Sequence, residues 1–88
     1  MSEQTKTERQ YDKGIGFYAD GRFKKAAKWY RKAADQGYAS AQNNLALMYE
    51  NGQGVTQSYP EAVKWYRLAA DQGYAYAKYR LAELGACK

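Results

Sequence analysis

The side chains that could do chemistry in this 88-residue chain are ten tyrosines, two tryptophans, fourteen lysines and arginines, and one cysteine. Histidine is absent, so the chain lacks the side chain that most often acts as a general base near neutral pH. Cys87 has neither a histidine nor a second cysteine as a partner and cannot form an internal disulfide. The sequence also lacks the histidine, cysteine or carboxylate clusters that metal sites need. We therefore expect no enzyme activity, no metal site and no cofactor.

One glycine motif could suggest a nucleotide site. The residues Gly14-Ile15-Gly16-Phe17-Tyr18-Ala19 match the loose form of the dinucleotide-binding fingerprint. That fingerprint binds a pyrophosphate only where it follows a strand and opens a helix, whereas here it lies inside a helical pattern. We interpret the two glycines as positions where a neighbouring helix packs closely.

A stretch of thirteen residues occurs twice and shows how the chain is organised. Ala26–Tyr38 reads AAKWYRKAADQGY, and Ala62–Tyr74 reads AVKWYRLAADQGY. The offset between the two copies is 36 residues, and 15 of the 21 residues from position 26 to 46 are identical to the residue 36 positions later. A period between about 20 and 50 residues is typical of a solenoid, in which each unit buries its apolar face against its neighbours.

Apolar residues at helical spacing predict an all-α domain of about five antiparallel helices, or two and a half helix-turn-helix units. Glycines end the second, fourth and fifth helices, and Ser58-Tyr59-Pro60-Glu61 fits a capping box at the start of the fourth. Trp29 and Trp65, at the same position of the repeat, are predicted to lie in the core. The predicted helices span about Glu8 to Ala19, Phe23 to Gly37, Ala39 to Asn51, Ser58 to Gly73, and Ala75 to Leu84.

The predicted organisation is a flexible lead-in over residues 1–9 followed by one helical-repeat domain over residues 10–88. Its units would cover about 10–37 and 38–73, with a half unit over 74–88. The sequence has no apolar run long enough for a membrane span or a signal peptide, and a single cysteine is typical of a reducing compartment. We expect a cytoplasmic protein that does not contact membranes.

The residues from Ala26 to Val55 follow the pattern AxxWYRxAADQGYAxAQxxLAxMYxxGxGV, which resembles the Sel-one-like repeat, a relative of the tetratricopeptide repeat. The resemblance returns from Ala62 to Leu84, where Gly85 replaces the expected tyrosine. It implies a right-handed superhelix of paired helices whose concave face is lined by the first helix of each pair. It also implies protein–protein interaction without catalysis. Small members resemble inhibitors and immunity proteins, so we expect a stand-alone bacterial inhibitor, immunity or adaptor protein.

Aligning the first helices of the units on Gly14, Ala46 and Ala82 indicates which residues would face the concave groove. Aromatic residues beside polar groups suit recognition of a protein segment, because tyrosine buries a large area at low entropic cost. The alternative is that these tyrosines only pack on one another. The candidate groove residues are Tyr11, Ile15, Tyr18, Asn43, Leu47, Glu50, Tyr76, Tyr79 and Glu83.

A second candidate surface is a basic convex face on the second helix, where no acidic residue occurs between Arg22 and Ala34. It could be a solvated face, a contact for an acidic protein, or a contact for a nucleic-acid backbone, which positive charge alone can bind. The second copy of this helix carries Leu68 where the first has a lysine. An exposed leucine could form a contact between two copies of the chain, so the sequence is compatible with a monomer or a weak homodimer. The face consists of Arg22, Lys24, Lys25, Lys28, Arg31 and Lys32.

A protein partner is therefore the main expectation, with an acidic surface if it binds the basic face. The alternative is a nucleic-acid-associated protein that binds phosphates through Arg22 to Lys32.

Overall fold

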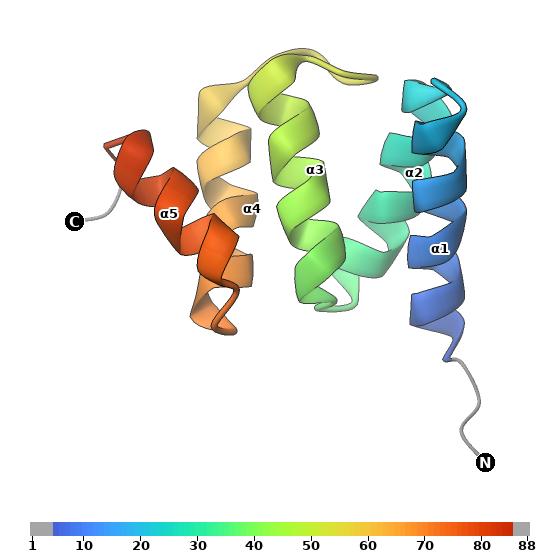
Figure 1. Ribbon diagram of the computed structural model, residues 1–88, viewed down its shortest axis with the longest axis horizontal. Coiled ribbons are helices and arrows are strands. Elements are labelled where there is room, and N and C mark those ends of the chain that lie inside the picture. The colour runs from blue at the N-terminus through green and yellow to red at the C-terminus, as the bar shows by residue number, and fades with distance from the viewer. Residues whose placement is uncertain (1–4, 86–88) are drawn as a thin grey trace.

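The computed structural model describes residues 5–85 and contains five α-helices and no strand over that range. The all-α prediction is confirmed. The helices run up and down in the order of the chain and form a curved row that measures 41 × 29 × 17 Å (Figure 1). Their bounds are α1 Lys6–Ala19, α2 Phe23–Asp35, α3 Ala39–Asn51, α4 Tyr59–Asp71 and α5 Ala75–Glu83.

Helix α1 begins at Lys6, two residues before the predicted start, because Thr5 caps it. The Thr5 hydroxyl accepts a hydrogen bond from the Glu8 amide (3.1 Å), and the Glu8 carboxylate accepts one from the Thr5 amide (2.9 Å). This reciprocal pair is a capping box. Residues 5–9 therefore belong to the helical domain and not to a flexible lead-in, while residues 1–4 of that segment, like Cys87, lie outside the described residues.

The capping box predicted for α4 forms only in part. The Ser58 hydroxyl accepts from the Glu61 amide (3.2 Å), but the Glu61 carboxylate lies 3.8 Å from the ammonium group of Lys64. The Ser58 amide donates instead to the Tyr49 carbonyl (2.9 Å), so the reciprocal half of the box does not form.

Repeated glutamines hold each helix pair together. At the C-cap of α2, the side-chain amide of Gln36 donates to Gln10 of α1 (2.7 Å), and at the C-cap of α4 that of Gln72 donates to Gln42 of α3 (2.9 Å). The chain then turns through a glycine with positive φ, 90° at Gly37 and 91° at Gly73. Residues at equivalent positions of the two units therefore make the same contacts at the end of each helix pair.

The core consists mainly of alanines, with two tyrosines, one tryptophan and a few larger aliphatic side chains between them. Tyr30 of α2 and Tyr66 of α4 are buried, at 3% and 0% exposed. The Tyr30 ring lies so close to Gly14 of α1 that a Cβ atom there would stand 2.5 Å from the ring. The close approach predicted for this glycine is therefore present, whereas a Cβ atom on Gly16 would meet open space.

The two tryptophans differ in burial, which corrects part of the core prediction. Trp65 is buried, but Trp29 is only half-buried. The ammonium groups of Lys13 and Lys32 lie over the Trp29 ring, 5.3 and 5.4 Å from its centroid. Among residues 5–85 no equivalent of α2 precedes it, and lysine side chains cover this ring.

Each helix packs mainly against the helices immediately before and after it in the chain. Helices α1, α2 and α3 therefore form one group, with α3 shared between this group and the group of α3, α4 and α5 (Figure 1). Over residues 5–85, no helix has the length and apolar character to cross a membrane.

Candidate functional site

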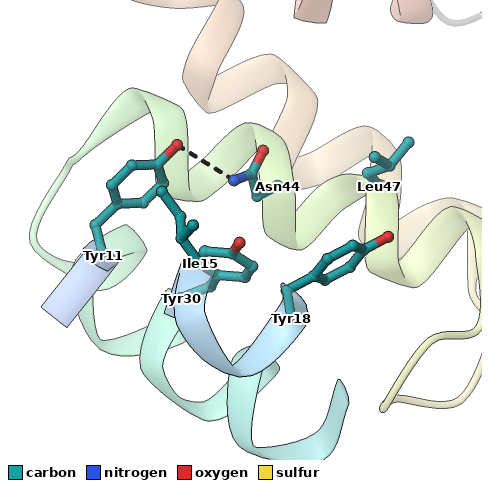
Figure 2. A pocket seen from close by; sticks show the side chains of 6 residues that line it. All are labelled: Tyr11, Ile15, Tyr18, Tyr30, Asn44 and Leu47. Carbon is teal, nitrogen blue, oxygen red and sulfur yellow. Dashed lines mark hydrogen bonds between the residues drawn. The ribbon is translucent and has the colours of Figure 1, made fainter. Parts of the chain in front are cut away.

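A pocket of about 270 Å³ opens between α1 and α3, and one residue of α2 also lines it (Figure 2). Its volume lies just below the range for sites that hold a drug-sized ligand, so it matches one or two side chains better than a whole small molecule. Its accessible lining is mostly apolar. The lining residues are Tyr11, Ile15 and Tyr18 of α1, Tyr30 of α2, and Asn44 and Leu47 of α3; we call this site the tyrosine pocket.

Helical spacing gathers these side chains. Tyr11, Ile15 and Tyr18 follow one another at intervals of four and three residues, which places them on one face of α1. Asn44 and Leu47, three residues apart, form the matching face of α3. Figure 2 shows the two α1 tyrosines extending toward the residues of α3. The pocket therefore depends on the packing of three consecutive helices.

Hydrogen bonds and ring contacts hold the tyrosines in place. The Asn44 amide nitrogen donates to the Tyr11 hydroxyl (3.4 Å), and the Tyr18 hydroxyl donates to the side-chain oxygen of Gln53 (3.0 Å). The Tyr11 ring packs 5.8 Å from that of Tyr30, centroid to centroid. A site whose side chains are already fixed loses less conformational entropy when it binds.

The tyrosine pocket is lined by uncharged residues. Burial raises the pKa of Tyr30 from 10.0 to about 12 and also raises the pKa of Tyr11. Both hydroxyls therefore keep their protons near neutral pH and act as donors and acceptors without charge.

The second helix group carries an ion pair at the corresponding place. Glu50 of α3 and Arg80 of α5 form a bidentate contact, and the Tyr66 hydroxyl donates to the same carboxylate (2.8 Å). The Glu50 and Arg80 side chains are only 13% and 20% exposed. Burial and the neighbouring carboxylate raise the pKa of Tyr66, and the hydrogen bond to Glu50 raises the pKa of Arg80. This network joins α3, α4 and α5.

The structure brings four of the predicted groove residues together and separates the others. Tyr11, Ile15, Tyr18 and Leu47 line the tyrosine pocket, whereas Glu50 is bound in its ion pair. Tyr76, Tyr79 and Glu83 are exposed on α5, away from the pocket lining; the two tyrosine rings lie 6.2 Å apart.

Asn43 is not on the groove surface, contrary to the prediction. It is 5% exposed, and its side-chain oxygen has no hydrogen-bond partner among the described residues. Asn43 aligns with Tyr11, but α3 has neighbouring helices on both sides and the short asparagine side chain stays beneath them. The next residue, Asn44, lines the pocket instead.

The sequence reasoning missed Tyr30 and Asn44. Tyr30 belongs to the apolar stripe of α2, so its pattern indicates core, yet its side chain also lines the pocket. Asn44 follows Asn43 by one position. It could have been predicted by asking which residues of α3 face α1.

The basic face, as defined above by six residues from Arg22 to Lys32, is exposed in all of its members. Several of its cations are already engaged. Arg31 lies 3.3 Å from the Asp35 carboxylate and 5.3 Å from the Trp65 ring, and Lys25 lies 5.5 Å from the Phe17 ring. Lys24 and Lys28 are exposed lysines of the same helix.

Within residues 5–85, no group of three or more metal-binding side chains is present.

Comparison with known proteins identifies the repeat. The family described as Sel1 repeat matches residues 11–38 and 39–74. A crystal structure of a Sel1 repeat protein from Oxalobacter formigenes superimposes with a TM-score of 0.83 and 42% sequence identity. The match covers 90% of this chain and 34% of that one, so the chain spans about a third of the length of that protein. A comparison with curated proteins gives no match.

Proposed function

Because the chain belongs to the Sel1 repeat family, whose repeats are modules for protein–protein interaction, we propose that it binds a segment of one protein partner in the tyrosine pocket. A module of this kind acts by holding the segment that it binds and so covering it, as adaptors and inhibitors do. The family fold is that of a non-enzymatic interaction module.

The observation that carries the proposal is a preformed, mostly apolar pocket with an exposed aliphatic side chain at its edge. Ile15 is 43% exposed although it is a large apolar residue, and it stands between two tyrosines that are fixed by hydrogen bonds or ring contacts. Rigid aromatic side chains around an apolar centre are typical of the energetically dominant part of a protein interface.

Affinity capture with the purified chain as bait tests the proposal. Ile15→Glu places a carboxylate at the pocket edge, where a bound segment would have to desolvate it. We expect the partner captured by the unaltered chain to be lost or retained at least about tenfold less, which corresponds to about 1.4 kcal/mol. Nuclease treatment of the lysate removes partners that are bridged by nucleic acid.

Leu68→Glu is the matched control. Leu68 is 41% exposed on α4, which contributes no residue to the tyrosine pocket, so the same change of charge and side-chain type is made elsewhere. Circular dichroism should show equal helix content in both variants. Equal loss of the partner in both, or retention in both, would contradict the proposal.

A further inference from the structure

The two helix groups contain two versions of one site. The residue offset is 32 from α1 to α3 and 36 from α2 to α4 and from α3 to α5, because the loop after α3 is longer than the loop after α1. At these offsets Tyr18 corresponds to Glu50, Asn44 to Arg80, and Tyr30 to Tyr66. The repeat thus places an open, uncharged pocket in one group and an internal ion pair in the other.

The two groups differ in how charge is balanced at this place. In the second group the protein supplies both charges itself, and Tyr66 adds a hydrogen bond to the carboxylate. In the first group Tyr18 and Asn44 bring no charge, so a charged occupant of the tyrosine pocket would be buried without a counter-ion. Burying an unpaired charge costs far more than burying a neutral group.

We propose that the tyrosine pocket selects an uncharged aliphatic anchor, a leucine, isoleucine or methionine side chain of the partner segment, and that Tyr18 and Asn44 determine this selectivity. This rests on the proposed function. The size of the pocket, about 270 Å³, suits one such side chain with part of its backbone. Ile15 and Leu47 supply apolar contacts. The hydroxyl and carboxamide groups around them pair with the backbone amide and carbonyl groups beside the anchor.

Selection from a random nine-residue peptide library displayed on phage tests the inference without a known partner. The chain is compared with the double variant Tyr18→Glu, Asn44→Arg, which copies the ion pair of the second group into the tyrosine pocket. We expect the unaltered chain to enrich peptides that share one aliphatic position with no acidic or basic residue beside it. The double variant should retain those peptides at least tenfold less.

The matched control is Tyr59→Glu with Leu68→Arg, which adds the same two charges at exposed positions of α4 and should retain the peptides unchanged. If the pocket double variant loses helix content, Asn44→Arg alone takes its place, because Asn44 is only half-buried.

The outcomes separate the two proposals. Enriched peptides that share a charged residue and depend on the pocket would overturn the selectivity while leaving the proposed function intact. Peptides that bind the pocket variant as well as the unaltered chain, or no enrichment at all, would overturn both.

Discussion

Gly14 is the residue at which core packing and the tyrosine pocket meet. Its missing side chain lets the Tyr30 ring lie against the α1 backbone, and the same ring forms part of the pocket lining. A methyl group at this position would displace the ring. The residue therefore affects both the stability of the α1–α2 pair and the shape of the site.

We predict that Gly14→Ala destabilises the protein and that Gly16→Ala stabilises it. Alanine gains about 1 kcal/mol over glycine in a helix interior, but at position 14 its Cβ would stand 2.5 Å from Tyr30, an overpacking that costs about 1–3 kcal/mol. At position 16 the Cβ meets open space, so only the gain remains. Urea unfolding of both variants measures the difference, and a stabilised Gly14→Ala protein would refute the packing account.

Among the elements, α5 depends most on a single electrostatic link. Ala82 of α5 is exposed, whereas the corresponding Ala46 of α3 is fully buried, because among the described residues no helix packs on the far side of α5. Arg80 ties this helix to Glu50 on α3. Side-chain contacts between α3 and α5 therefore matter more for the position of α5 than contacts between α1 and α3 do for that of α1.

We predict that Arg80→Met loosens α5. The substitution keeps the apolar stem but leaves Glu50, which is 13% exposed, without its cation. We expect a loss of about 1–3 kcal/mol and faster hydrogen exchange in α5 than in α1. Asp35→Asn is the control, since it breaks the half-exposed pair with Arg31 and leaves the contact of Arg31 with the Trp65 ring in place; such a pair contributes less than about 1 kcal/mol. Equal losses of stability in the two variants would show that the Glu50–Arg80 pair stabilises the protein no more than an exposed ion pair does.

The helices were predictable from the sequence because their stripes of small residues repeat with a fixed period. Their bounds agree to within about two residues. The tyrosine pocket was only partly predictable, since its lining depends on which side of α3 faces α1. A one-residue rotation separates buried Asn43 from pocket-lining Asn44, and helical periodicity does not resolve a step that small. The ion pair between Glu50 and Arg80, 30 residues apart, is a contact that periodicity alone does not indicate.

At the scale of the whole molecule, charge and apolar surface are separated. The tyrosine pocket has an uncharged lining, while the basic face lies along α2 and carries six of the fourteen lysines and arginines. The two surfaces suit different partners, so a contact on one does not require the other.

We predict that the basic face gives weak, salt-dependent affinity for polyanions. Lys24→Glu with Lys28→Glu should elute from a heparin column at lower salt than Lys6→Glu with Lys78→Glu, because cations concentrated on one face bind phosphate or sulfate chains together. Both double variants lower the net charge of +5 by four, so they differ only in the location of the change. Elution at the same salt would show that net charge alone is responsible and would remove the nucleic-acid alternative for this face.

The packing of each helix mainly on its neighbours in the chain has a consequence for how the protein is made. Few contacts join helices that are not consecutive, so the first hairpin, α1 with α2, has most of its packing partners as soon as it leaves the ribosome. Repeat arrays of this kind fold by adding units to a structured neighbour, and domains generally fold from the N-terminus during synthesis. The tyrosine pocket would then be complete once α3 has emerged, while α4 and α5 are still inside the ribosomal exit tunnel.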